Sequence, residues 1–292
     1  MIDAMVNGLS GLIIGFQYLV VDWRNLIMIF VGLGLLYLAI KKDCEPLLLV
    51  PIGFGCIIVN IPFSNIMGAE GFVKVIYDAG IATELFPLLI FIGIGAMTDF
   101  GPVLARPSTF LLGEAGQCGI FLTLLLALAL GFPKLHAVSI GIIGACDGPT
   151  AIYVTSKYAP ELLGAVAVAA YCYMSLVPIV QPPIMRFMTT RKEREVVMSS
   201  QAKPVSKTTK LLFPLVITIL GGLIAPMGLP LLGTIMLGNL MRESGVVERL
   251  TKASQNEIAN VVTLLLGISI GATMESRIFL QPQTLIILAL GF

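Results

Sequence analysis

Long apolar runs separated by short polar stretches dominate the chain. Runs close to the about 20 residues that a helix needs to cross a bilayer cover residues 23–40, 110–130, 137–155 and 162–185. Shorter apolar runs, several of them interrupted by Pro or Gly, cover residues 47–62, 85–97, 211–225, 229–240 and 258–272. The pattern predicts an all-α polytopic integral membrane protein that combines regular spans with irregular membrane elements.

A polar break at residues 186–210 divides the chain. Its charged residues are mainly basic, with Arg186, Arg191, Lys192, Arg194, Lys203, Lys207 and Lys210 against Glu193 and Glu195. A short loop this rich in Lys and Arg stays on the cytoplasmic side of a membrane. We therefore expect an N-terminal membrane repeat at residues 1–185, a basic cytoplasmic loop at 186–210, and the start of a second membrane repeat at 211–292.

Two segments in these halves resemble each other. Ile94-Gly-Ala-Met-Thr-Asp99 is echoed by Ile270-Gly-Ala-Thr-Met-Glu275, and Arg106-Pro-Ser-Thr109 is echoed by Gln281-Pro-Gln-Thr284. Chance similarity between Gly- and Ala-rich membrane segments is the alternative, but the shared order and spacing favour a true repeat. Repeats of this kind bring broken helices together near the bilayer midplane and place substrate sites at their interface.

The chain stops inside an apolar run that begins at residue 284. Residues 284–292 are too few to cross a bilayer, because a span needs about 20 residues. We therefore expect the C-terminal part of the protein to be missing. The internal repeat would place the second half's counterpart of the Asp147 motif, described next, beyond Phe292.

The strongest candidate for chemistry is Asp147, in the middle of the apolar run 137–155. An ionised carboxylate at that depth costs about 2.5–3.5 kcal/mol, and Gly148 and Pro149 break the helix beside it. Lipid does not solvate the freed backbone carbonyls, so protein, water or a cation must do so. These features predict a coupling-cation site at Asp147 and Gly148. The alternative is an ordinary Asp-Gly-Pro turn at the membrane surface.

The composition supports a membrane protein and excludes other classes. Hydrophobic residues make up 57% of the chain and charged residues 12%, against about 25% charged in soluble domains. A net charge of +1 argues against a nucleic-acid role. The cysteines form no C-x-x-C pair, so we interpret them as small structural residues; they are Cys44, Cys56, Cys118, Cys146 and Cys172. Residues 1–20 lack the basic start of a signal peptide and indicate an amphipathic or partly inserted segment.

Several motifs, taken together, are characteristic. They are Glu45-Pro-Leu-Leu-Leu-Val-Pro-Ile-Gly53, Gly95-Ala-Met-Thr-Asp-Phe-Gly-Pro102, Gly144-Ala-Cys-Asp-Gly-Pro-Thr-Ala151, Ala159-Pro-Glu-Leu-Leu-Gly164, and Ala169-Ala-Tyr-Cys-Tyr173 continuing to Gln181-Pro-Pro-Ile-Met-Arg186. Over most of the chain from about residue 20 onward, the sequence resembles the β subunit of the sodium-pumping, biotin-dependent decarboxylases. These enzymes act on oxaloacetate, methylmalonyl-CoA, glutaconyl-CoA or malonate.

The resemblance implies a function and a set of partners. Such a subunit decarboxylates carboxybiotin delivered by a carrier domain and couples this step to sodium ion export, as part of a translocase in the plasma (inner) membrane of a prokaryote. The implied partners are membrane lipid, a carboxyltransferase (α) subunit, a biotin carrier subunit and a small membrane-anchored subunit, with no biotin attached to this chain. Asp147 is similar to the family's sodium-linked carboxylate, and Tyr173 resembles a residue placed for the ion or proton step.

The implied chemistry needs little from the protein. Carboxybiotin loses CO2 once its carboxylate leaves water, and a proton must then reach the ureido nitrogen. Tyr173 is the candidate donor, and an ordinary buried or interfacial tyrosine is the alternative. Pro178 is expected to interrupt the helix that carries Tyr173 and to leave the carbonyl of Met174 without its helical partner, as a further oxygen for sodium.

The sequence departs from the family in one respect. The family carries a later motif with an Asn, a Gly, a Ser and an Arg facing the Asp motif, and nothing in this sequence matches it. Asn260 and Ser269 have a similar spacing, but they lie in the repeat of the Gly95 region, so we do not assign that role to them. Asp99 and Glu114 are weaker site candidates. A solvated helix end explains Asp99, and snorkelling or pairing with Arg106 explains Glu114.

A rival interpretation comes from another functional class. An ion-coupled secondary transporter, either a carboxylate carrier or a sodium/proton antiporter without a chemical step, would use a broken helix with one Asp equally well. Neighbouring genes for a biotin carrier and a carboxyltransferase would distinguish the two, because a solitary transporter needs neither. A third possibility is a fragment without function of its own.

Overall fold

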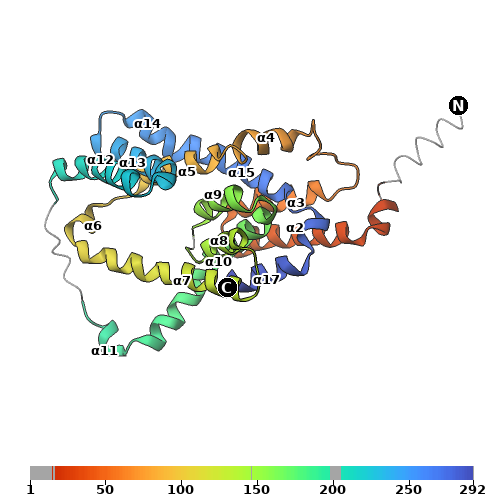
Figure 1. Cartoon of the computed structure of the whole chain (residues 1–292), viewed down its shortest axis with the longest axis horizontal. Helices are drawn as coiled ribbons and strands as arrows, with labels where there is room; N and C mark the ends of the chain where they lie inside the picture. The colour runs from red at the N-terminus through yellow and green to blue at the C-terminus, as the bar shows by residue number, and fades with distance from the viewer. Residues whose placement is uncertain (1–14, 16, 146, 198–204, 292) are drawn as a thin grey trace, which may run out of the picture.

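The computed structural model describes residues 15, 17–145, 147–197 and 205–291. The predicted N-terminal segment at residues 1–20 lies mostly outside this part, and Cys146 lies outside it as well. Within the described residues all regular secondary structure is helical (Figure 1). The structure therefore confirms the predicted all-α class.

The first half of the chain begins with a helical hairpin and ends in a long apolar helix. Its helices are α2 (Trp23–Lys42), α3 (Pro46–Val59), α4 (Phe72–Gly80), α5 (Leu85–Met97), α6 (Gly101–Ala105) and α7 (Phe110–Ala129). The following segment forms α8 (Lys134–Gly141), a 3-10 turn (Ile142–Ala145), α9 (Gly148–Tyr158), α10 (Leu163–Met188) and the short α11 (Arg191–Arg194).

The second half repeats the opening order of the first. Its helices are α12 (Lys207–Ile224), α13 (Leu229–Ser244), α14 (Glu248–Ala253), α15 (Ala259–Ala272), α16 (Ser276–Phe279) and α17 (Pro282–Gly291). A long hairpin (α2–α3 or α12–α13) is followed by a short helix, a helix that ends at the repeated Gly-Ala motif, another short helix and an apolar helix. This order supports the repeat that the sequence predicts.

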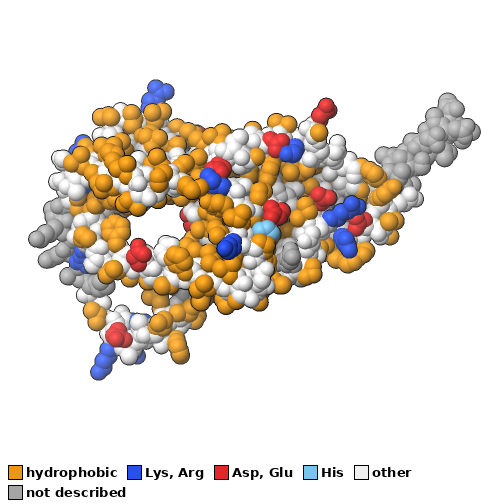
Figure 2. Space-filling model, viewed as in Figure 1, with side chains coloured by type: hydrophobic (Ala, Val, Ile, Leu, Met, Phe, Trp, Pro, Cys, Tyr) orange, Lys and Arg blue, Asp and Glu red, His pale blue; other side chains and the backbone are white. Residues whose placement is uncertain are grey.

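Several helices are long and apolar enough to cross a membrane. They are α2, the segment Pro107–Ala129 that contains α7, and α12, and α4 and α5 together make a further candidate span that is bent by 61°. Large hydrophobic side chains lie exposed along α7 and α12, and hydrophobic side chains cover much of the visible face (Figure 2). A surface in contact with lipid explains why so much apolar area is left uncovered. The polytopic membrane class is confirmed.

Two boundaries differ from the predictions. The predicted interruption at Pro178 is wrong, because α10 continues as one helix from Leu163 to Met188; membrane helices tolerate Pro where neighbouring groups satisfy the freed backbone. The irregular part of the predicted loop 186–210 is also shorter than expected, because α12 already begins at Lys207. Between these helices α11 starts with a capping box, in which Thr190 and Glu193 satisfy each other's backbone N–H groups.

The two halves pack against each other through a pair of crossed contacts. α3 packs on α15, and α5 packs on α13, as Figure 1 shows for each pair. A Cβ atom added at Gly271 would lie 2.1 Å from the carbonyl oxygen of Ile52, so the α3–α15 crossing brings backbones into direct contact. Small residues allow membrane helices this close approach.

The α5–α13 crossing shows the same close approach of two helix backbones. A Cβ atom at Gly95 would lie 1.9 Å from the carbonyl oxygen of Ile235, and one at Gly238 would lie 2.0 Å from that of Ile92. Gly95 and Gly271 follow the Ile residues that the predicted repeat equates. The repeat therefore corresponds to equivalent packing, with each half supplying one helix to each crossing.

Candidate functional site

Asp147 lies where one helix stops and another starts. After α8 the chain tightens into the 3-10 turn Ile142–Ala145, and α9 begins at Gly148. Asp147 itself is extended, with φ −127° and ψ 103°, in the N-cap position. Pro149 belongs to the first turn of α9, where its missing N–H costs no helical hydrogen bond. The predicted helix break is therefore present, and the carboxylate stands directly beside it.

The carboxylate of Asp147 has a polar neighbour in α9. Asp147 is half-buried, and the hydroxyl of Thr150 donates a hydrogen bond to its Oδ2 atom. The first backbone N–H groups of α9 also point toward this end and favour negative charge there. A carboxylate oxygen and a hydroxyl oxygen at a helix break are groups that a hard cation can bind.

Two helices enclose the break by close packing. A Cβ atom at Gly144 would lie 2.8 Å from the backbone of Gly119 in α7, and one at Gly148 would lie 2.1 Å from Cε1 of Tyr171 in α10. Gly148, which the sequence predicts as part of the cation site, is buried. Its lack of a side chain lets α10 approach the first residue of α9.

Tyr171 is a residue that sequence reasoning missed. Its side chain is fully buried, and its ring packs on Gly148, whereas Tyr173 is partly buried and packs at the margin of the core. Because successive helical residues turn by about 100°, Tyr173 lies on a different face of α10. The motif Ala-Ala-Tyr-Cys-Tyr contains both tyrosines, but only the rotation of α10 shows which one meets the break. The assignment of Tyr173 as proton donor stays a prediction.

The weaker candidates lie elsewhere. Asp99 follows α5 and accepts a hydrogen bond of 2.8 Å from the N–H of Gly101, and Lys210 lies 3.4 Å from the same carboxylate oxygen. The Gly101 N–H, with a further contribution from Lys210, holds the pKa of Asp99 below its usual value. This environment is that of a paired, solvated helix end. Glu114 is exposed on α7.

The broken end of α5 differs from the Asp147 break because side chains already donate hydrogen bonds to its backbone carbonyl oxygens. The second half donates these hydrogen bonds: Gln255 to the Ala96 oxygen (2.6 Å), Arg242 to the Met97 oxygen (3.0 Å) and Asn239 to the Thr98 oxygen (2.9 Å). These oxygens therefore satisfy the requirement for internal pairing without a cation.

The broken end of α15 is held in the same way by the first half. The Asn60 side chain donates to the Met274 oxygen at 2.9 Å and accepts from the Ser276 N–H at 2.9 Å. Met274 and Thr98 are equivalent positions of the repeat. Each half thus supplies an asparagine to the broken helix of the other half.

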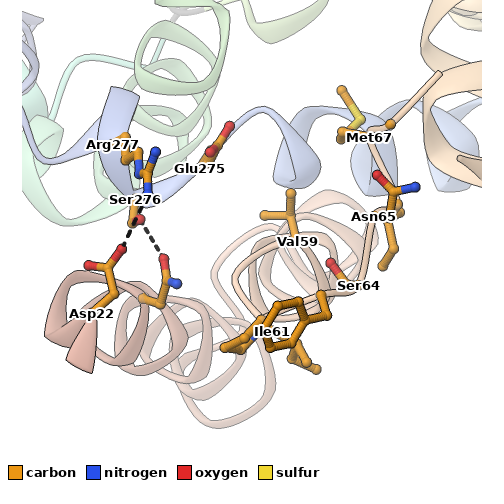
Figure 3. Close-up of a pocket in the computed structure, with 14 residues that line it drawn as sticks. Asp22, Val59, Ile61, Ser64, Asn65, Met67, Glu275, Ser276 and Arg277 are labelled. Atoms are coloured by element: carbon orange, nitrogen blue, oxygen red, sulfur yellow. Dashed lines mark hydrogen bonds and ion pairs between the residues drawn. The ribbon is translucent and has the colours of Figure 1, made fainter. Parts of the chain in front are cut away.

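A polar pocket of about 430 Å³ lies beside this end of α15 (Figure 3). The Ser276 hydroxyl lies 2.5 Å from Oδ1 of Asn25, and Arg277 lies 3.9 Å from Asp22. These contacts join the start of α2 to the segment after α15. We interpret the pocket as part of this connection, because these four polar side chains pair across it.

Four of the five cysteines lie in the described part of the chain, and their structural role stays a prediction. Cys44, Cys56, Cys118 and Cys172 are free thiols, and the buried Cys56 donates a hydrogen bond to the Met28 oxygen at 3.4 Å. Among the described residues, no group of at least three His, Cys, Asp or Glu side chains could hold a metal ion.

Comparisons with known proteins match the chain to one family. Residues 24–292 match the family described as Na+-transporting oxaloacetate decarboxylase beta subunit. The chain is 51% identical to the methylmalonyl-CoA decarboxylase subunit beta of Veillonella parvula, over 99% of this chain and 76% of that protein. It is 49% identical, with the same coverage, to the glutaconyl-CoA decarboxylase subunit beta of Acidaminococcus fermentans.

A third relative is named as a subunit of an oxaloacetate decarboxylase. The chain is 45% identical to the oxaloacetate decarboxylase beta chain of Klebsiella pneumoniae, over 98% of this chain and 80% of that protein. The family match covers nearly the whole chain, and the relatives are named as subunits of decarboxylases. The chain therefore belongs to the family of beta subunits of sodium-transporting decarboxylases, and it takes part in enzymatic decarboxylation as a membrane subunit of a complex.

Proposed function

We propose that this chain decarboxylates carboxybiotin and uses the reaction to export sodium, with Asp147 as the sodium-binding carboxylate. The observation that carries the proposal is the Asp147 carboxylate, half-buried at the break before α9 and hydrogen-bonded by Thr150. Membership of a sodium-transporting family makes sodium the cation of choice. At the α5 and α15 breaks, by contrast, side chains from the other half of the chain hydrogen-bond the freed carbonyls.

The chemical step would follow from exclusion of water. A carboxybiotin group supplied by a carrier domain would lose its carboxylate as CO2, and one proton would replace it on the ureido nitrogen. Tyr173 in α10 is the proposed donor of that proton. A change in the charge balance near Asp147 would then alter the affinity for sodium. We propose a carboxyltransferase subunit, the biotin carrier and a small membrane-anchored subunit as the partners, in the plasma membrane of a prokaryote.

The test uses the assembled complex with Asp147→Asn, which keeps the side-chain size and removes the charge. We expect sodium-stimulated decarboxylation to be lost while transfer of the carboxyl group to biotin continues. Asp78→Asn is the matched control, because Asp78 is an exposed residue that pairs with Lys74 on α4. Native sodium stimulation in Asp147→Asn would contradict the proposal. Sodium exchange that continues without any decarboxylation would instead favour a secondary transporter.

A further inference from the structure

The ring of Tyr171 lies directly against the helix break. Its side chain is 0% exposed. A Cβ atom on Gly148 would lie 2.1 Å from Cε1 of Tyr171 and 2.6 Å from its Oη atom. No such atom could fit without movement of the ring or of α9. Gly148 and Tyr171 are therefore a matched pair, with an absent side chain on one helix and a large ring on the other.

This contact controls the place where α9 starts. Gly148 is the first residue of α9, and Asp147, its N-cap, precedes it directly. A rigid ring packed on Gly148 limits how far α9 can slide or rotate, and so limits where the Asp147 carboxylate can lie. Asp147 is joined directly to Gly148, so the ring of Tyr171 packs beside the residue that carries the carboxylate.

We infer that Tyr171 is a positioning residue, whose ring fixes the start of α9 and thereby holds the Asp147 carboxylate in the geometry that binds the cation. This inference rests on the proposed role of Asp147 in sodium binding. Tyr171 acts through Gly148 and Asp147, so its loss should change the affinity for sodium more than the rate at saturating sodium. The packing function belongs to the ring, so phenylalanine should replace tyrosine.

The first test measures the sodium concentration that gives half-maximal decarboxylation by the assembled complex. Loss of groups that support metal ligands commonly weakens metal affinity about 10-fold to 100-fold. We therefore expect Tyr171→Leu to raise this concentration at least about tenfold, with a smaller effect on the maximal rate, and Tyr171→Phe to stay near the native value. Phe91→Leu is the control for losing a buried ring, since Phe91 is 2% exposed in α5. It should reduce stability and leave the sodium requirement unchanged.

The second test exchanges the sizes of the two partners. Gly148→Ala should impair sodium activation or assembly, because its methyl group overlaps the ring. Adding Tyr171→Leu to Gly148→Ala should recover part of the loss, since the smaller side chain leaves room for the methyl group. This comparison also works with assembly as the readout if the single variant does not assemble.

The outcomes separate this inference from the function on which it rests. A native sodium requirement in Tyr171→Leu, or no recovery in the double variant, would overturn the positioning role. If Asp147→Asn abolishes sodium stimulation in the same preparation, the proposed function survives that failure. If Asp147→Asn keeps native sodium stimulation, the proposed function itself is wrong. A Tyr171→Phe variant as impaired as Tyr171→Leu would assign the effect to the hydroxyl and contradict the role of the ring.

Discussion

Replacing Asn60 tests whether the halves really hold each other's broken helices. Asn60 is 2% exposed and makes two contacts with the segment after α15, to the Met274 oxygen and from the Ser276 N–H, each 2.9 Å long. Asn60→Ala leaves both backbone groups without this partner. A buried polar group left unsatisfied costs about 1–3 kcal/mol, so the expected loss of unfolding free energy is about 2–4 kcal/mol.

Two further asparagines give a graded series. Asn239 makes the equivalent contact to a single carbonyl, that of Thr98, so Asn239→Ala should cost about 1–2 kcal/mol. Asn256 is exposed, and the hydrogen bond that its side chain makes among the described residues goes to the Lys252 oxygen one turn away. Asn256→Ala should therefore stay within about 0.5 kcal/mol of the native protein.

Unfolding of the purified complex in detergent with increasing denaturing surfactant measures the series. We expect the order Asn60→Ala, then Asn239→Ala, then Asn256→Ala, from least to most stable. Equal stability of Asn60→Ala and Asn256→Ala would refute the conclusion that the asparagine of one half stabilises the broken helix of the other half.

Two other predictions follow from the same structure. Gly271→Ala should lower stability by about 1–3 kcal/mol, the range for overpacking, because its Cβ atom would lie 2.1 Å from the Ile52 oxygen. Gly34→Ala should be neutral or slightly stabilising, since no atom lies within 4 Å of that Cβ position. Unfolding of both variants measures the difference, and an equal loss of stability would contradict the α3–α15 contact. The Gly101 N–H, and then Lys210, lower the pKa of Asp99 from its ordinary value of 3.8, so its stabilisation is complete above that value and is lost as the pH falls through the lowered pKa. Asp99→Asn should therefore be less stable than the native protein at neutral pH and equal to it in strong acid, as stability measured across that pH range would show, and a difference that persists unchanged in acid would contradict the ion pair.

The break at Asp147 could be predicted because its causes are local. Gly148 and Pro149 limit the backbone by their own covalent structure, and a carboxylate in an apolar run is visible in any sequence. The similarity of Ile94–Asp99 to Ile270–Glu275 likewise revealed the repeat, because equivalent backbone packing selects similar small residues at both crossings.

Other features depend on contacts that a local pattern does not contain. Whether Tyr171 or Tyr173 faces the break depends on the rotation of α10 against α9, and both tyrosines are compatible with an apolar helix. Asn60 binds Met274 and Ser276, more than 200 residues away in sequence (|i−j| = 214 and 216), so its role appears only when the halves are packed. Pro178 was expected to interrupt α10, yet the helix continues, because a proline removes one backbone hydrogen bond and the surrounding protein can compensate for it.

The most direct test of the account is sodium uptake by the complete complex in sealed proteoliposomes, driven by its decarboxylation substrate. The native complex should accumulate sodium while substrate is consumed, and the complex with Asp147→Asn should accumulate none above the level without substrate. The control Asp78→Asn should transport like the native complex. Substrate-driven sodium accumulation at the native rate in Asp147→Asn would contradict the assignment of this carboxylate as the sodium site.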